Sequence, residues 1–224
     1  MRKIVIFSGA GVSQESGIST YRDTDGIWTK FNPEDVVDIN GWKRNPQLVL
    51  DFHNIARKEM SKAEPNESHK IIAELESKYE VTVITQNIDN LHEKAGSTNV
   101  IHLHGEIDKV RSLDTDEVVE WDTHTDITLE DNLRPHVVWF GEMPLRMDES
   151  IKAIKECDFL VIIGTSLSIG YTHALLMQNK LKNVWYVDPY PKNSSIRESR
   201  LFRKVRFIRK IASEGMLEIK NMLV

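Results

Sequence analysis

The sequence predicts an α/β fold with a mostly parallel sheet. Four apolar runs rich in β-branched residues are typical of strands that are buried on both faces of such a sheet. Each run ends in small or polar residues, and the carboxyl ends of parallel strands are where open α/β sheets bind ligands. The four runs are Lys3–Phe7, Val81–Thr85, Phe159–Ile163 and Val184–Val187. A length of 224 residues suits one large domain with a small insertion.

Further elements follow from the same patterns. Two more apolar runs, Val100–Leu103 and Val137–Phe140, are candidates for additional strands. We expect helices where apolar residues recur with the helical period. These expected helices cover Pro46–Met60, His69–Lys78, Asp148–Glu156, Tyr171–Leu181 and Ser213–Met222.

Composition narrows the class of protein. The chain has 40% apolar and 28% charged residues, a formal net charge of −5 and one cysteine, Cys157. A single cysteine cannot close an internal disulfide or supply the thiolates of a usual zinc cage, and no neighbour of Cys157 would make it a nucleophile, so we expect it to be buried. No apolar run approaches the roughly 18 residues of a membrane helix, and the run after Met1 is too short for a signal-peptide core. We therefore expect a soluble, cytoplasmic protein without a membrane partner.

Charge is unevenly distributed along the chain. Between Glu106 and Asn132 there are ten acidic and two basic residues, a net of −8, which leaves +3 for the rest. Much of the positive charge lies between Lys180 and Lys210. Solvated loops account for both features, and the alternative for the acidic segment is that it attracts lysine-rich substrates. Nucleic-acid binding is not expected, because the chain is acidic overall and its basic stretch contains no reading motif.

A glycine loop follows the first expected strand. The segment Lys3–Gly11 has the strand-then-glycine form of a dinucleotide site, where missing side chains let the backbone approach a pyrophosphate. A hydride-transfer dehydrogenase would have a third glycine where this chain has Gln14, so that class is disfavoured. The polar stretch after the loop could fold over a cofactor and supply Arg22 to a phosphate or carboxylate. Alternatively, Arg22 pairs with Asp23 or Asp25.

Six motifs occur in one order along the chain. They are Gly9-Ala10-Gly11-Val12-Ser13, Tyr21-Arg22-Asp23, Thr85-Gln86-Asn87-Ile88-Asp89-Asn90-Leu91-His92, His102-Leu103-His104-Gly105, Val138-Trp139-Phe140-Gly141-Glu142 and Gly164-Thr165-Ser166-Leu167. In sequence and order they closely resemble the sirtuin family of NAD-dependent protein-lysine deacylases. The segments Asp25–Trp28, Arg44–Pro46 and Leu133–Pro144 are most similar to the class that includes bacterial deacylases and the mitochondrial desuccinylase.

The resemblance implies a Rossmann-like, mostly parallel sheet with a smaller inserted module. The expected large, NAD-binding domain comprises residues 1–30, 79–105 and 134–224, and the expected module comprises residues 31–78 and 106–133. NAD would lie extended between the two, and the acyl-lysine of a protein substrate would enter from the opposite side. The acyl oxygen would attack the ribose carbon that bears nicotinamide, and a histidine would then activate a ribose hydroxyl.

The resemblance also implies the catalytic residues. His104 matches the family's base, which suits histidine because its pKa is near neutrality without extreme tuning. His102, two residues earlier in an extended run, should face the other side and is the structural histidine beside the catalytic candidate. Asn87 and Asp89 complete the expected catalytic set. A turn after a buried strand explains an asparagine and an aspartate there, but not the order Gln-Asn-Ile-Asp.

The NAD contacts are implied in the same way. Gln86, Asn87 and Asp89 would surround the nicotinamide and its ribose with directional hydrogen bonds. Gly164, Thr165 and Ser166 resemble the family's phosphate and adenosine-ribose contacts. Their alternative role is that of a helix cap after a strand. Asp188 stands where many sirtuins have an asparagine beside the adenosine ribose, which keeps an acceptor and adds charge. The full expected set is Gly9, Ala10, Gly11, Ser13, Tyr21, Arg22, Trp28, Gln86, Asn87, Ile88, Asp89, Gly164, Thr165, Ser166, Asp188 and Ala212.

A separate segment is implied to bind the substrate. Val138, Phe140 and Gly141 match the segment that pairs with the substrate backbone and lines the lysine tunnel, where apolar walls fit the lysine stem. Since alternate residues of a strand face opposite sides, one of Trp139 and Phe140 should be a core aromatic.

Two positions of the small module bear on acyl specificity. The desuccinylating class recognises an acidic acyl group with a tyrosine and an arginine three residues apart, and this chain has His53 and Ala56 at those positions. Loss of both donors removes a clamp worth roughly 1.5–3 kcal/mol per hydrogen bond. Arg57 lies about 100° further around a helix, which argues against its replacing them. The sequence therefore predicts a deacetylase with weak or no desuccinylation.

The chain departs from most sirtuins at the zinc ribbon. That four-cysteine ribbon belongs between His104-Gly105 and Leu133–Pro135, and none of its cysteines is present. His124 and nearby carboxylates could offer ligands to a hard cation, but the acids lack the spacing of a calcium loop, so we expect neither zinc nor another metal. A compact hairpin around Val110–Ser112 and Val118–Trp121 should replace the ribbon. The family's zinc is structural, so its loss is compatible with activity.

Three functions remain compatible with the motifs. The first is an NAD-consuming protein-lysine deacetylase, a transferase also classed with hydrolases, which yields nicotinamide, deacylated lysine and O-acyl-ADP-ribose. The second is a mono-ADP-ribosyltransferase or NAD glycohydrolase, and the third is a non-catalytic NAD sensor. The segment Val138–Glu142 favours deacylation, and the presence of His104, Asn87 and Asp89 disfavours a sensor. The oligomeric state and the protein substrates are left open.

Overall fold

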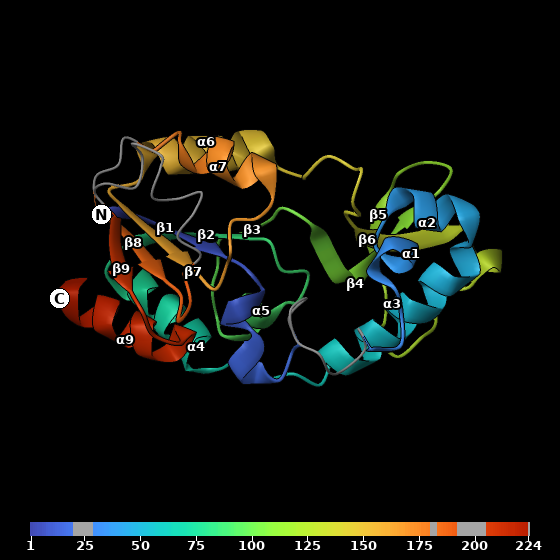
Figure 1. Ribbon diagram of the computed structural model, residues 1–224, viewed down its shortest axis with the longest axis horizontal. Coiled ribbons are helices and arrows are strands. Elements are labelled where there is room, and N and C mark those ends of the chain that lie inside the picture. The colour runs from blue at the N-terminus through green and yellow to red at the C-terminus, as the bar shows by residue number, and fades with distance from the viewer. Residues whose placement is uncertain (20–28, 180–182, 192–204, 224) are drawn as a thin grey trace.

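A six-stranded sheet forms the larger part of the computed structural model, which describes residues 1–19, 29–179, 183–191 and 205–223. Its strand order is β3-β2-β1-β7-β8-β9, and every pairing is parallel (Figure 1). The strands are β1 (Lys3–Ser8), β2 (Glu80–Thr85), β3 (Val100–His102), β7 (Phe159–Ile163), β8 (Val184–Val187) and β9 (Val205–Ile208). The predicted α/β class and mostly parallel sheet are confirmed.

Both faces of this sheet are covered, which explains why its strands are apolar without alternation. On one face Ile4 and Ile6 of β1 pack with residues of α4 and α9. On the other face Val5 and Phe7 pack with residues of α6 and α7. The two pairs of helices lie on opposite sides of the sheet in Figure 1. They are α4 (Glu67–Glu74), α6 (Met147–Glu156), α7 (Gly170–Leu176) and α9 (Ala212–Leu223).

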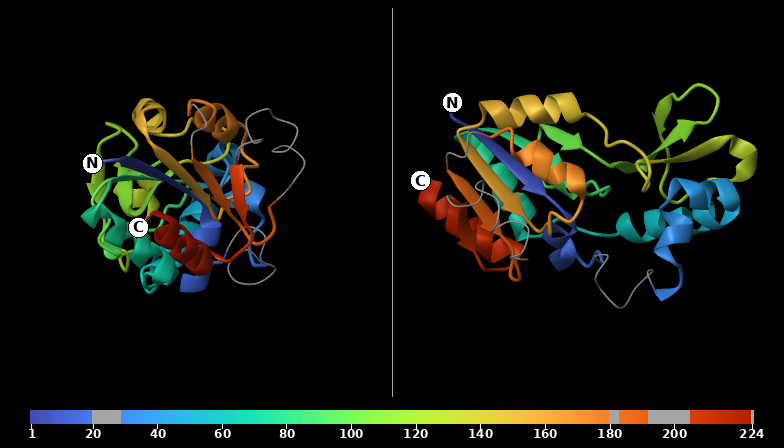
Figure 2. Two further views of the ribbon diagram at one scale, coloured as in Figure 1. Left: turned by 90° about the vertical axis from the view of Figure 1, so that its left-hand side faces the viewer. Right: turned by 45° about the horizontal axis from the view of Figure 1, so that its top comes forward.

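A smaller unit contains an antiparallel sheet with the order β5-β4-β6, and it forms a separate lobe in Figure 2. Its elements are α1 (Pro33–Val36), α2 (Ile39–Arg44), α3 (Pro46–Met60), β4 (Gly105–Ser112), β5 (Val118–Glu120) and β6 (Leu133–Val137). Val49 of α3 packs against Ile107 of β4 and Val137 of β6. The hairpin expected in place of a zinc ribbon is present, with Val110 paired to Val119.

Two elements belong to a different unit from the one that the sequence predicted for them. Helix α4 falls within the residues expected for the module, but it packs with α9 beneath the large sheet. All of strand β6 after Leu133 falls within the residues expected for the large domain, but β6 pairs with β4 in the small sheet. In both cases the packing surface, rather than the position in the chain, decides which unit the element joins.

Several boundaries differ from the sequence prediction. The strand expected at Val137–Phe140 is instead β6, which ends at Val137, because the Trp139 N–H donates to the Glu142 carboxylate and leaves the ladder. Helix α7 ends at Leu176, five residues earlier than expected. The edge strand β9 has no predicted counterpart. The remaining short elements are α5 (Leu91–Lys94) and 3₁₀ helices at Ala10–Val12, Gln14–Ser16, Leu75–Ser77 and Leu129–Asp131. Within the described ranges, no helix has the length and apolar character needed to cross a bilayer.

Candidate active site

The loops after β1 and β7 are in close contact at the carboxyl edge of the sheet. The Gly9 N–H donates to the Ile163 carbonyl at 3.1 Å, and the Gly11 N–H donates to the Gly164 carbonyl at 2.8 Å. Gly164 has a φ of +61°, and a Cβ there would lie 2.3 Å from the Val12 nitrogen. Glycine is required here because a side chain would drive the two loops apart.

A polar cluster joins the first loop to the loop after β2. Ser13 Oγ donates to Asp89 Oδ2 at 2.9 Å and accepts from Asn87 Nδ2 at 3.0 Å. All three residues are buried, and burial raises the pKa of the Asp89 carboxyl above its ordinary value. The expected catalytic residues Asn87 and Asp89 are therefore brought together, and Ser13 holds their side chains in fixed orientations.

His104 lies between the two lobes, just before β4. Its Nδ1 is 2.7 Å from the Gln86 carbonyl, which can only accept, so Nδ1 carries the proton and Nε2 the lone pair. Burial lowers the pKa of His104, while the Gln86 carbonyl opposes that shift. The Gln86 side chain also accepts from Thr165 Oγ1 at 2.7 Å, which links the loops after β2 and β7. The ring is thus held as a neutral base.

His102 has different partners from His104. Its Nδ1 faces the Asn87 carbonyl at 3.1 Å and its Nε2 faces a Glu93 oxygen at 2.8 Å. Burial lowers the pKa of His102, but the hydrogen bond and charge of Glu93 outweigh burial and leave that pKa raised. Because both nitrogens of His102 face hydrogen-bond acceptors, the ring acts as a donor and offers no lone pair for a base. This fits the expected structural role.

The segment expected to bind substrate leaves the small sheet and crosses toward α1 and α2. The Val138 N–H donates to the His104 carbonyl at 2.8 Å, which ties this segment to the candidate base. Trp139 is 2% exposed whereas Phe140 is 54% exposed, so Trp139 is the core aromatic of the pair. Glu142 accepts from the Trp139 N–H and pairs with Arg134 at 2.7 Å, and this pair fixes the turn.

The two acyl-specificity positions lie on α3 and are buried. His53 Nε2 accepts a hydrogen bond from Trp139 Nε1 at 2.9 Å, and burial together with the charge of Arg134 lowers the pKa of His53 to about 3. Ala56 is 3% exposed. Arg57 turns away from them, and its guanidinium donates to the carbonyls of Ile107, Trp121, Asp122 and Thr125.

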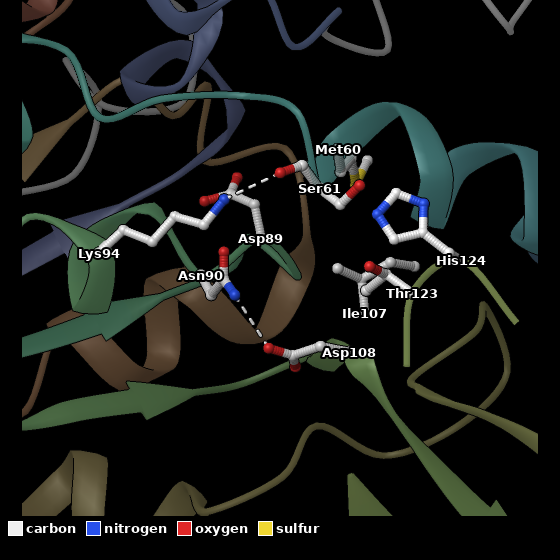
Figure 3. A pocket seen from close by; sticks show the side chains of 9 residues that line it. All are labelled: Met60, Ser61, Asp89, Asn90, Lys94, Ile107, Asp108, Thr123 and His124. Carbon is white, nitrogen blue, oxygen red and sulfur yellow. Dashed lines mark hydrogen bonds between the residues drawn. The ribbon is translucent and has the colours of Figure 1, made fainter. Parts of the chain in front are cut away.

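A cavity of about 220 Å³ lies beside Asp89 of the polar cluster (Figure 3). It is lined by Met60, Ser61, Asp89, Asn90, Lys94, Ile107, Asp108, Thr123 and His124. Lys94 Nζ donates to the Ser61 carbonyl and Asn90 donates to Asp108, so both ends of the cavity are held by hydrogen bonds. Of its lining, the sequence singled out Asp89 as an NAD contact and His124 as a possible metal ligand.

The remaining expected NAD contacts are spread along the same edge of the sheet. Asp188 follows β8 and accepts from the Tyr190 N–H at 2.7 Å, and Ala212 begins α9. Ser166 bonds Ser168, Ala10 is exposed, and the Ile88 carbonyl accepts from the Ile107 N–H. Tyr21, Arg22 and Trp28 lie outside the described residues.

Neither a metal site nor a reactive thiol is found among the described residues. Across the part of the chain that the structure describes, no group of three or more His, Cys, Asp or Glu side chains could hold a metal ion. Burial raises the pKa of the Cys157 thiol to about 11, and Asn179 donates to its sulfur. Cys157 is therefore unsuited to nucleophilic chemistry.

Sequence comparison agrees with this geometry. The Sir2 family matches residues 9–170, which include the glycine loop, His104 and the loop after β7. The chain belongs to the Sir2 family. This sirtuin is 42% identical over 236 residues to the "NAD-dependent protein deacylase" of Helicobacter pylori, with 100% of the chain and 98% of the relative aligned. A protein of the same description from Bacteroides thetaiotaomicron is 40% identical over 239 residues, covering 100% of the chain and 99% of the relative.

Solved structures resemble this sirtuin along its whole length. A Sir2 homologue in complex with NAD superimposes with a TM-score of 0.84 at 30% identity, covering 99% of this chain and 89% of that one. A second Sir2 enzyme gives a TM-score of 0.77 at 35% identity, covering 98% and 91%. Both comparisons support the Rossmann-like fold with its small module.

Proposed function

We propose that this sirtuin is an NAD-dependent protein-lysine deacetylase with weak or no desuccinylation. The observation that carries the proposal is the position of His104, a half-buried neutral histidine held by the Gln86 carbonyl between the two lobes. NAD supplies the ribose that loses nicotinamide and accepts the acyl group. The relatives named as NAD-dependent protein deacylases support the general activity.

The residues at the edge of the sheet fit NAD as co-substrate. The loops after β1 and β7 are packed through glycines, so the edge that faces the co-substrate is formed largely by backbone. The hydroxyls of Ser13 and Thr165 and the amides of Gln86 and Asn87 offer donors and acceptors together, as ribose hydroxyls and a carboxamide require. Their mutual hydrogen bonds orient these groups before the co-substrate arrives.

Each chain residue then has a distinct task. His104 Nε2 accepts the proton of a ribose hydroxyl, and the Gln86 carbonyl stabilises the charged ring that results. Asn87 and Asp89 orient the nicotinamide end. The segment with Val138 and Gly141 binds the substrate backbone, and the bond from the Val138 N–H to the His104 carbonyl holds this segment beside the base.

The acyl preference rests on what stands at positions 53 and 56. His53 is neutral at physiological pH and already hydrogen-bonded to Trp139, and Ala56 has no donor. Arg57 is committed to four backbone carbonyls of the small module. The carboxylate of a succinyl group would therefore lose its hydration without gaining a charged partner.

Product analysis by mass spectrometry tests the activity. With NAD and matched peptides, we expect acetyl-lysine to yield deacetylated peptide, nicotinamide and O-acetyl-ADP-ribose in equal amounts, and succinyl-lysine to react more slowly. Faster turnover of succinyl-lysine would contradict the acyl preference. Free ADP-ribose or ADP-ribosylated protein without deacylation would instead favour the alternative chemistry.

The role of His104 is tested by His104→Asn. An asparagine amide can still donate to the Gln86 carbonyl but offers no base, so we expect deacylation to be lost while the melting temperature stays close to that of the wild type. Retained turnover would exclude His104 as the base.

Zinc independence is part of the proposal. Arg57 joins α3 to the loop at residues 121–125, in the segment where most sirtuins place their ribbon. We expect zinc to be absent from purified, untagged and active protein. One equivalent of zinc, measured by elemental analysis, would be the contrary result.

A further inference from the structure

The basic nitrogen of His104 is bound to a tyrosine to which the proposed chemistry assigns no task. Tyr171 lies in the first turn of α7, and its hydroxyl is 2.6 Å from His104 Nε2. The two rings meet edge to face, with centroids 5.9 Å apart. Since the Gln86 carbonyl fixes the proton on Nδ1, Nε2 is the acceptor and the Tyr171 hydroxyl is the donor.

A closed set of hydrogen bonds surrounds this contact. The Gln86 side chain bonds the Tyr171 hydroxyl and accepts from Thr165, and the Gln86 carbonyl accepts from His104. Burial raises the pKa of Tyr171 to about 12, and the bond from Gln86 only partly offsets this, so the hydroxyl keeps its proton. Tyr171 is the titratable group that faces His104 from α7; among the described residues, no acid or base shifts the pKa of either ring.

Nε2 has one lone pair, so the Tyr171 hydroxyl and a ribose hydroxyl cannot both donate to it. We propose that Tyr171 is a positioning residue: its hydroxyl holds His104 Nε2 while NAD is absent, and it leaves when the ribose hydroxyl takes its place. This inference rests on the proposed role of His104 as the base.

The start of α7 is suited to such a release. Gly170 is exposed, and a Cβ there would meet nothing within 4 Å, so the backbone before Tyr171 is not wedged in place. The N-cap residue Ile169 makes no side-chain capping bond. One hydroxyl replaces another on Nε2, so Nε2 has a hydrogen-bond donor before and after the exchange.

The proposal predicts that Tyr171→Phe changes the free enzyme and leaves the NAD-bound enzyme nearly unchanged. Donation from Tyr171 stabilises the neutral ring, so its loss should raise the pKa of His104 in the free protein by roughly 0.5–1 unit. The KM for NAD should fall roughly two- to tenfold, because the ribose no longer competes with Tyr171. The turnover number should change little, since Tyr171 has already left in the complex.

Steady-state kinetics against pH test this on the full chain with an acetylated peptide. The acid limb of kcat/KM reports the free enzyme and that of kcat reports the complex. In Tyr171→Phe we expect the acid limb of kcat/KM to move to higher pH and the acid limb of kcat to stay at the same pH. Tyr79→Phe is the matched control, because its hydroxyl is bound to the Leu223 carbonyl at the other end of the sheet. A hundredfold loss of kcat would overturn the proposal and indicate that Tyr171 relays the proton.

An NMR titration separates this proposal from the proposed function. The His104 ring signal, assigned by its loss in His104→Asn, is followed against pH in wild type and Tyr171→Phe without substrate. A rise in its pKa in Tyr171→Phe, absent in Tyr79→Phe, supports the contact even if the acyl group has been misassigned. An unchanged pKa would overturn the proposal whatever the enzyme's activity.

Discussion

Single glycines decide whether the loops after β1 and β7 can meet. Gly9 and Gly11 face Gly164 so closely that an added Cβ on either would lie within 3 Å of the opposite loop. Gly164 also has a left-handed backbone, which costs a residue with a Cβ about 1–2 kcal/mol. Contact between the loops is therefore sufficient to explain the glycine pattern of the sequence.

Gly164→Ala tests this contact. The added methyl group collides with backbone of the first loop and adds to the left-handed strain, so we expect about 3 kcal/mol of lost stability and at least a tenfold higher KM for NAD. Gly17→Ala is the matched control, because Gly17 has a φ of +82° but nothing within 4 Å of its Cβ. The Gly17→Ala variant should show only the destabilisation that comes from the left-handed backbone. Equal effects of the two substitutions on KM would contradict the loop contact.

Sequence reasoning located the candidate residues but not all their partners. The residues at positions 13, 87, 89 and 104 were predicted from their motifs, and the structure brings the first three into one hydrogen-bonded cluster. Tyr171 was not predicted, because a bond between residues 67 positions apart leaves no local pattern in the sequence. The second partner of this half-buried histidine depends on where α7 packs on the large sheet.

At the scale of elements, the small module is organised around one side chain of α3. Arg57 is fully buried, and its guanidinium donates to carbonyls of β4 and of the loop at residues 121–125. Burial lowers the pKa of Arg57, while Asp122, Asp126 and Asp108 raise it. A single planar group with five donors thus joins α3, β4 and the loop at residues 121–125.

Arg57→Met should destabilise the module strongly. The substitution removes all four hydrogen bonds of the buried guanidinium, so we expect a loss of roughly 3 kcal/mol or more in unfolding by guanidinium chloride. Lys58→Met is the control on the next residue, because Lys58 makes a solvent-exposed ion pair with Asp126, which is worth at most about 1 kcal/mol. Comparable losses in both variants would argue against a central role for Arg57.

The predictability of an element depended on how its faces are buried. The strands β1, β2, β7 and β8 were predicted because burial on both faces leaves continuous apolar runs. The edge strand β9 escaped prediction since Arg206 interrupts the apolar run of Val205, Phe207 and Ile208. The assignment of α4 and β6 to a lobe depends on non-local packing, which a periodic pattern does not encode.

At the scale of the whole molecule, three buried histidines couple stability to pH. Burial lowers the pKa of His53 to about 3 and of His69 to about 4, and burial with nearby His69 and His102 holds that of His92 well below its ordinary value. In the unfolded chain each would titrate near 6.5. Between pH 6.5 and about 4 the unfolded state therefore binds more protons, and stability falls as the pH falls.

His53→Gln isolates one of these contributions. Glutamine keeps an acceptor for the Trp139 indole N–H but has no ionisable group. Each buried neutral histidine contributes about 1.4 kcal/mol per pH unit in this window, so the slope of unfolding free energy against pH should be smaller by that amount in the variant. Two groups act with the opposite sign: Asp89, whose pKa burial raises, and His102, whose contribution is full below pH 6.5 and is lost as the pH rises through its raised folded value. Because both are present in the two proteins, the difference between their slopes from pH 4.5 to 6.5 measures His53 alone. Identical slopes in urea unfolding would show that His53 is protonated in the folded protein.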